Sequence, residues 1–306
     1  MVGRSRAYCS PMPPKEIKMK FRSFLLILVA LLFFGCASSP EVSDKEPIAT
    51  ETVVEEVQKE PVEIITTVYY PVKVDSYFGD GVKDEYTVYS YNEDGSLLLK
   101  EELFSTEDSL QQSVVFEYTG TESSVKSIYD GGENLLSYEL NLIDIDGNTL
   151  KKEKFDSKDV LQSKSEYEFK DGKKITWKVF NETGSLLSTT NYNYTNDVLT
   201  RIDSLSPAGE LEEYFDLQYD SNGLLLENKH FNSEGQIQDS RSFEYKDGFL
   251  VMELVNRKNG SVLRKLMYKN DQFGNPVETI YMDAGDNVQE RLITIYESRE
   301  EISYEK

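Results

Sequence analysis

The sequence contains 306 residues, of which 39% are hydrophobic and 29% charged, and its formal net charge is -22. A surface this acidic repels nucleic-acid phosphates over a Debye length of about 10 Å, so we expect no nucleic-acid partner. The 20 Tyr and 15 Phe favour the half-buried surfaces of a β-sheet over disorder.

The N-terminal segment has the pattern of a secretory signal. Basic residues at 18–22 precede an apolar run at 23–34, and Gly35 and Cys36 follow it. The run is shorter than the roughly 20 residues that a transmembrane helix needs. Four Pro or Gly residues precede Met19, which we take as the start of translation.

The end of this run, Leu32-Phe-Phe-Gly-Cys36, resembles the lipobox of bacterial lipoproteins. The likeness is closest to the relaxed lipoboxes of spirochaete-type lipoproteins, because two Phe residues replace the more common Leu and small residue. The resemblance implies that residues 1–35 are a signal peptide and that Cys36 carries palmitate-like acyl chains that bind the membrane. An ordinary signal peptide with an incidental cysteine is the alternative.

Residues 36–63 have no aromatic side chain and are rich in acidic residues. This composition predicts a disordered tether between the anchor and a folded body at residues 64–306. Ala37, rather than Asp, after the cysteine favours the outer membrane over the inner one under the enterobacterial sorting rule. Whether the body faces the periplasm or the cell surface stays open.

The folded body is marked by turn signals about 12 to 13 residues apart, each in a short polar segment. Two-residue hairpin turns need positive φ, which Gly, Asn and Asp adopt at low cost. The signals are Gly95, Asp108, Gly120, Gly132, Gly147, Asp159, Gly172, Gly184, Asp197, Gly209, Gly223, Gly235, Gly248, Gly260, Gly274 and Gly285. The spacing predicts one strand between successive turns and therefore an array of β-hairpins.

The segments Tyr219-Asp-Ser-Asn-Gly-Leu224 and Tyr245-Lys-Asp-Gly-Phe-Leu250 resemble the Tyr-Asp (YD/RHS-type) repeat. The chain is also similar to the MORN-variant repeats of antitoxin-like proteins. Its polar hairpins, which follow a lipobox-like cysteine, are also similar to the single-layer sheets of spirochaete surface lipoproteins.

We expect an all-β antiparallel meander of about 16–18 strands in a twisted, curved sheet that rolls over its aromatic face. A β-propeller is the alternative, since two hairpins would make one four-stranded blade. A membrane barrel is disfavoured, because the strands carry charge on one face and a lipid anchor is already present.

Aromatic residues two apart on a strand lie on one face and provide a candidate binding surface. Flat aromatic rings can stack on a sugar or peptide at little entropic cost, although filling the sheet's own core is the competing role. The candidates are Trp177, Tyr167, Phe169, Tyr192, Tyr194, Phe243 and Tyr245, of which Trp177 is the first to test.

The sequence gives little support for a catalytic site or a metal site. His230 is the single histidine, and no nearby motif supplies a catalytic or zinc-binding set around it, so a structural role is expected. The segment Asp144-Ile-Asp-Gly-Asn148 has part of a calcium-loop pattern but lacks the distal Glu, so it is interpreted as a turn. We expect no cofactor and no metal.

The sequence therefore predicts a non-enzymatic, lipid-anchored envelope protein whose repeat array binds a protein or glycan partner. The alternative is an antitoxin or immunity protein that neutralises a toxin in the envelope, since an acidic body suits a basic toxin. A hydrolase is disfavoured.

Overall fold

The computed structural model describes residues 62–120 and 122–305, which form strands connected by short turns. The strands within these ranges are β1 (Val62–Phe78), β2 (Lys83–Tyr91), β3 (Leu98–Ser105), β4 (Leu110–Thr119), β5 (Ser123–Asp130), β6 (Leu135–Ile143), β7 (Thr149–Asp156), β8 (Leu161–Lys170), β9 (Lys173–Asn181), β10 (Leu186–Thr195), β11 (Val198–Leu205), β12 (Leu211–Tyr219), β13 (Leu225–Asn232), β14 (Ile237–Lys246), β15 (Phe249–Arg257), β16 (Val262–Asn270), β17 (Pro276–Asp283) and β18 (Val288–Glu305).

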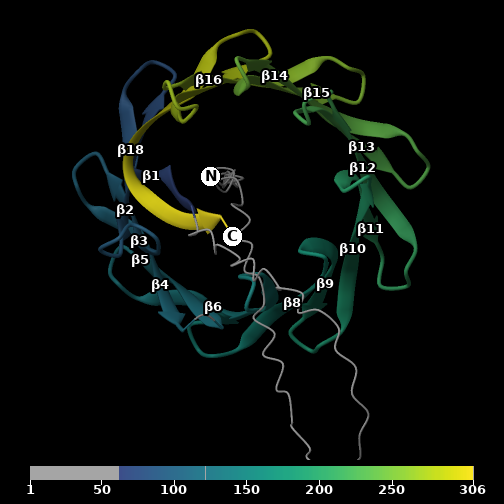
Figure 1. Cartoon of the computed structure of the whole chain (residues 1–306), viewed down its shortest axis with the longest axis horizontal. Helices are drawn as coiled ribbons and strands as arrows, with labels where there is room; N and C mark the ends of the chain where they lie inside the picture. Colours follow the sequence, from purple (N-terminus) through teal and green to yellow (C-terminus); the bar gives the residue numbers. More distant parts are fainter. Residues whose placement is uncertain (1–61, 121, 306) are drawn as a thin grey trace, which may run out of the picture. The chain divides into compact units, whose positions relative to one another are not determined.

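The strands form one antiparallel meander that closes on itself. Each strand pairs with the next along the chain, and β1 also pairs with β18, so the sheet becomes an 18-stranded barrel (Figure 1). The expected antiparallel meander and its strand number are confirmed. The expected twisted and curved sheet, left open, and the propeller alternative are both wrong, because the pairing of the two terminal strands removes both sheet edges.

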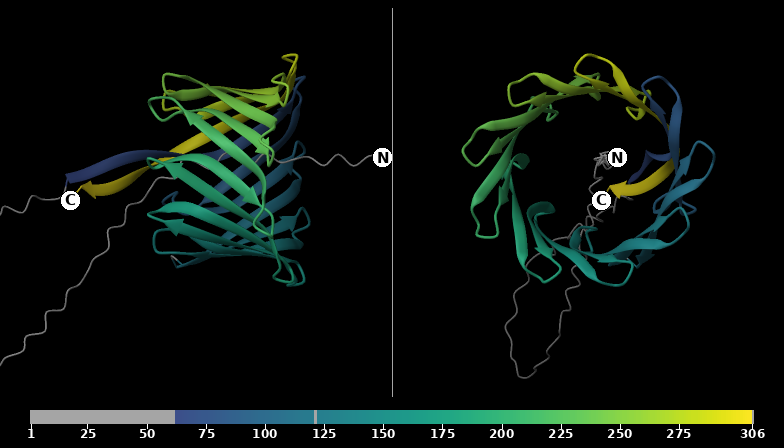
Figure 2. Two further views of the ribbon diagram at one scale, coloured as in Figure 1. Left: turned by 90° about the vertical axis from the view of Figure 1, so that its right-hand side faces the viewer. Right: turned by 180° about the vertical axis from the view of Figure 1, so that it is seen from behind.

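The two strands that close the barrel are also its longest, with 17 residues in β1 and 18 in β18. The strands run obliquely along the barrel wall (Figure 2), as the closure of a sheet requires. Their pairing joins segments more than 200 residues apart in the sequence, so no hairpin signal could have announced it.

The turns follow the predicted positions closely. Fourteen of the sixteen predicted residues have positive φ, and at the other two the neighbouring Glu133 or Asp286 has it instead. In the Asp156–Val160 turn the amide of Asp159 (φ 61°) donates to the carbonyl of Asp156, the geometry of a three-residue hairpin loop with a left-handed last residue. Asp171 and Gly172 form a two-residue turn with both φ values positive. One turn, at Gly81, was not predicted.

Register shifts recur near both ends of the strands. In the middle of the chain, for example, they lie between Glu168 and Phe169, Asn193 and Tyr194, and Gln218 and Tyr219. Each places an extra residue on one strand of a pair, and such bulges increase local twist and bend the strand. A repeated bulge therefore provides the curvature that a closed barrel needs.

The outer face of the barrel is stabilised by repeated contacts between neighbouring strands. Tyr214 stacks on Phe231 with ring centroids 4.8 Å apart, and Arg201 lies over Tyr214 at 3.7 Å. Arg201 also pairs with Asp203 at 2.7 Å. Tyr–Phe stacks of the same kind join Tyr86 to Phe104 and Tyr138 to Phe155. Such cross-strand pairs contribute about 0.2–1 kcal/mol each.

The barrel has little conventional core. Among the described residues, the buried hydrophobic side chains are Phe243, Val255, Leu266 and Ile280, each 7–8% exposed. Most inner-face side chains are only half-buried, because a barrel of 18 strands is too wide for its inner side chains to fill. Stability therefore depends mainly on contacts between adjacent strands.

The barrel proper comprises residues 65–302, and the described residues outside it belong to a second unit. In that unit the Ser303 hydroxyl donates to the Ile64 carbonyl at 3.4 Å. No helix of a length and apolar character suited to crossing a membrane occurs among the described residues.

Candidate binding groove

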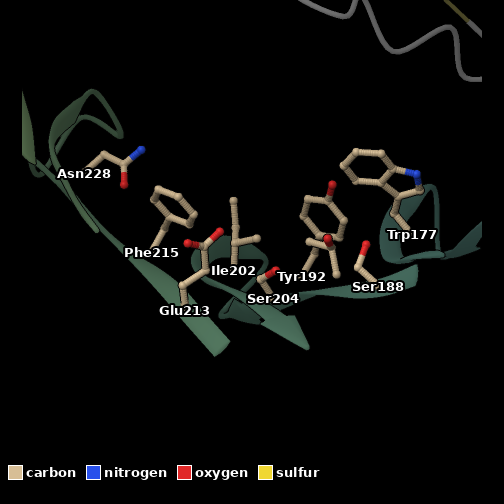
Figure 3. Close-up of a pocket in the computed structure, with 9 residues that line it drawn as sticks. Trp177, Ser188, Tyr192, Ile202, Ser204, Glu213, Phe215 and Asn228 are labelled. Atoms are coloured by element: carbon tan, nitrogen blue, oxygen red, sulfur yellow. The ribbon is translucent and has the colours of Figure 1, made fainter. Parts of the chain in front are cut away.

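A groove of about 410 Å³ lies on the concave, inner side of the sheet, across β9 to β13 (Figure 3). Aromatic, hydroxyl and carboxylate side chains share its surface. The lining residues are Trp177, Ser188, Thr190, Tyr192, Ile202, Ser204, Glu213, Phe215 and Asn228.

The strand register assembles this surface in two rows. Directly paired residues share a face of the sheet. One row runs from Trp177 through Thr190 and Ser204 to Glu213. The second row follows from the pairing of Tyr192 with Ile202, of Ile202 with Phe215, and of Phe215 with His230. Residues from five strands therefore meet on one face, although they span more than 50 positions in the sequence.

Two of the lining residues carry a buried polar atom that has no partner in the described structure. The indole Nε1 of Trp177 and the side-chain carbonyl Oδ1 of Asn228 are buried and have no hydrogen-bond partner within the described structure. An unsatisfied buried polar group costs about 1–3 kcal/mol. The hydroxyls of Ser188, Thr190 and Ser204 add groups that can both donate and accept.

The groove ends on a histidine held between two carboxylates. His230 Nδ1 lies 2.9 Å from Asp239 and Nε2 lies 3.0 Å from Glu213, and the ring stacks on Phe215 with centroids 4.5 Å apart. Burial alone would lower the pKa of His230, but the hydrogen bonds to Asp239 and Glu213 outweigh it and raise the pKa. When the ring is protonated, both nitrogens donate, and the Nε2 hydrogen bond orients the carboxylate of Glu213.

Three of the predicted aromatic residues come together here. Tyr167 pairs with Trp177 across β8 and β9, and their rings stack with centroids 6.1 Å apart. Trp177 and Tyr192 both line the groove. Burial raises the pKa of Tyr192, in keeping with its half-buried position on the wall.

The other four predicted aromatic residues lie outside the groove. The Tyr194 hydroxyl donates to the backbone carbonyl of Lys174 at 2.9 Å, which ties one hairpin to the preceding one. Phe169 is paired with Lys174. Phe243, on β14, is 7% exposed and is one of the four buried hydrophobic residues named above. Tyr245 is paired with Leu250, and burial raises its pKa.

Several groove residues were not predicted, including Ile202, Phe215, Glu213 and Asn228. The sequence around each of them has the alternating pattern of an ordinary strand. Only the register between strands places these residues beside Trp177. A spacing argument that added the offset of each hairpin could have placed Phe215 near His230, but this offset depends on the bulges.

The structure also describes the segment that has part of a calcium-loop pattern. Asp144 accepts hydrogen bonds from the backbone amides of Asp146 and Asn148, so this segment forms an ordinary side-chain-capped turn. In the described part of the chain, no three His, Cys, Asp or Glu residues are grouped so that they could hold a metal ion. Cys36, the expected lipidation site, lies outside the described residues.

Comparison with known proteins gives only slight likenesses. No protein-family model and no curated protein matches the sequence. Structural neighbours include a porin-like protein from Bacteroides uniformis (10% identity, TM-score 0.39), for which the match covers 76% of this chain and 98% of that chain. Another is the TcdB2-TccC3 toxin complex without its hypervariable region (11% identity, TM-score 0.21, 69% of this chain and 15% of that chain). A third is a putative outer membrane lipoprotein-sorting protein domain from Vibrio parahaemolyticus (6% identity, TM-score 0.17, 76% and 84%). These values are too low to carry an inference about function.

Proposed function

We propose that this chain is a non-enzymatic, lipid-anchored protein of the cell envelope whose barrel binds a carbohydrate in the inner groove. The observation that carries the proposal is the groove itself, where Trp177, Tyr192 and Phe215 share one wall with a row of hydroxyl groups. Aromatic faces stack on the apolar faces of sugar rings, and hydroxyl, amide and carboxylate groups pair with sugar hydroxyls.

The polar lining favours a ligand that both donates and accepts hydrogen bonds. The hydroxyls of Ser188 and Ser204 can do both, whereas the carboxylate of Glu213 accepts. A sugar hydroxyl can serve either need, which a purely apolar ligand cannot do. A peptide could also meet both needs, and binding of peptides in place of sugars is the outcome that would redirect the proposal toward a protein partner.

The chain contains one Trp, so its intrinsic fluorescence reports on the groove directly. Titration with a panel of oligosaccharides should change the emission of Trp177 in a saturable way. Calorimetry should then show that Phe215→Ala weakens binding of the responding sugar at least tenfold. Tyr214→Ala, next to it in sequence but on the outer face, is the matched control and should bind as the wild type does. A panel that gives no response by either method would refute carbohydrate binding.

The proposed anchor is tested separately. Cells expressing the wild type or Cys36→Ala are labelled with palmitate, and intact cells are treated with protease. Label on the wild type alone is expected, and digestion in intact cells would place the barrel at the cell surface. Protection from protease would place it in the periplasm. Absence of label on the wild type would refute the lipid anchor.

A further inference from the structure

Lys174, near the start of β9, lies on the inner wall beside the groove. It is paired with Phe169, and its ammonium nitrogen lies 5.3 Å from the ring centroid of Tyr167 and 5.5 Å from that of Tyr192. Its side chain is half-buried. The ammonium group therefore has aromatic rings on two sides.

This lysine differs from most of the other lysines that lie over aromatic rings. Most of those also pair with a carboxylate within 3.1 Å, namely Lys73, Lys83, Lys164 and Lys173. Lys126, over Phe116, also lacks a carboxylate within ion-pair distance among the described residues, but burial raises the pKa of Glu101 and the charge of Lys126 acts against that rise. No carboxylate within ion-pair distance of Lys174 occurs among the described residues. Its charge lacks the compensation that the paired lysines have.

The position of Lys174 makes it part of the same wall as the groove. Tyr192 lines the groove, and Tyr167 stacks on Trp177, so the two rings beneath the ammonium group are continuous with the aromatic surface. The carboxylate of Glu213 lies on the other side of the groove, where His230 already holds it. The groove thus has a donor end and an acceptor end.

We propose that the ligand is an acidic carbohydrate, whose anionic group pairs with Lys174 while its sugar rings lie along Trp177, Tyr192 and Phe215. This inference rests on the proposed carbohydrate-binding function and adds the ligand's charge. An ammonium group recognises an anion as a point charge, so carboxylate and sulfate sugars share the required chemistry. Removal of both charges from water strengthens their attraction compared with an exposed pair.

The acidic character of the whole chain does not oppose this pairing at short range. Charges separated by more than about 8–10 Å are largely screened at physiological salt, whereas the ammonium group would touch its anion. The long-range repulsion lowers the rate of encounter rather than the strength of the contact.

The test compares two ligands of the same shape that differ in charge. The full chain, purified in detergent, is titrated by calorimetry with an oligogalacturonate and with its fully methyl-esterified form. The wild type should bind the acid about tenfold or more tightly than the ester, since a charged hydrogen bond contributes about 1.5–3 kcal/mol and 1.4 kcal/mol is tenfold. A sulfated oligosaccharide and its desulfated form provide the second anion.

Variants then assign the preference to Lys174. Lys174→Gln should remove the preference for the acid and leave binding of the ester unchanged, and Lys174→Arg should retain it. Lys164→Gln, on the opposite face of the sheet over Phe180, is the matched control and should change neither affinity. Thermal melting of each variant shows whether it is folded.

Two outcomes separate this inference from the proposed function. Equal binding of acidic and neutral sugars by the wild type, or equal loss of both in Lys174→Gln, would overturn the assignment of Lys174 while leaving a carbohydrate groove in place. A failure of any sugar to bind, charged or neutral, would overturn the proposed function as well.

Discussion

Replacement of His230 by glutamine should destabilise the barrel at low pH and much less at high pH. The hydrogen bonds to Glu213 and Asp239 raise the pKa of His230 above its ordinary value of 6.5, against the effect of burial. A group whose pKa is raised on folding stabilises the folded state fully below its unfolded pKa. This contribution is lost as the pH rises through the raised folded value. The difference in stability between wild type and variant should therefore be large at pH 6 and small at pH 9.

The geometry sets the size of the effect. A hydrogen bond between charged groups contributes about 1.5–3 kcal/mol when it is well shielded. The His230 side chain is 18% exposed, but those of Glu213 and Asp239 are 45% and 47% exposed, so solvent weakens both interactions. Exposed ion pairs typically contribute about 0.2–1 kcal/mol each. Together they should provide about 1–2 kcal/mol at pH 6, or about 2–8 °C in melting temperature for a domain of this size.

Urea denaturation of wild type and His230→Gln, monitored by circular dichroism at pH 6, 7, 8 and 9, measures this difference. Tyr214→Phe on the outer face is a suitable control, because it removes no group that titrates in this range. A difference between wild type and His230→Gln that is constant across the range would refute the reasoning. So would one that increases with pH, since it would mean that the neutral ring is the stabilised form.

Three further substitutions test the barrel wall, each by urea denaturation. Tyr194→Phe removes the hydroxyl that donates to a β9 carbonyl at 2.9 Å, and should cost about 1 kcal/mol; no change would mean that the bond contributes nothing. Glu253→Ala removes a carboxylate with 3% exposure that pairs with Arg241 at 3.0 Å, and should cost about 2 kcal/mol or more. Gly274→Ala should cost more than the about 1–2 kcal/mol of a left-handed residue, because φ is 89° and the added Cβ would overlap the ring of Phe249; a neutral effect would contradict this.

The strands and turns of this fold could be predicted because their signals are local. A left-handed φ at a hairpin turn selects Gly, Asn or Asp whatever the rest of the chain does. Even the two displaced positions follow this rule, because the turns at Gly132 and Gly285 only move the left-handed residue to Glu133 and Asp286. The turn at Gly81 was not predicted, because it is the first in the array and no preceding turn was available to set the spacing.

Closure of the barrel could not be predicted from the same signals. It depends on β1 meeting β18, and on how far each strand is offset from its neighbour along the barrel. The bulges set part of this offset, and their positions are fixed by three-dimensional strain rather than by a residue type. The groove has the same origin. Trp177 and Tyr192 were predicted as aromatic candidates, but their common surface with Phe215 exists only in the final register.

The groove and the wall beside it have uncompensated groups, and these groups are the strongest reason to place a ligand there. The outer face satisfies its own charges and rings, as Arg201, Asp203, Tyr214 and Phe231 show in one connected set. A barrel held together by such contacts between neighbouring strands needs no packed interior. Inner-face side chains are then free of the requirement to fill a core, and they can leave an indole N–H and an ammonium group uncompensated. Such groups reduce stability unless something binds them, which makes the groove around Trp177 the part of the barrel whose residues are best explained by binding.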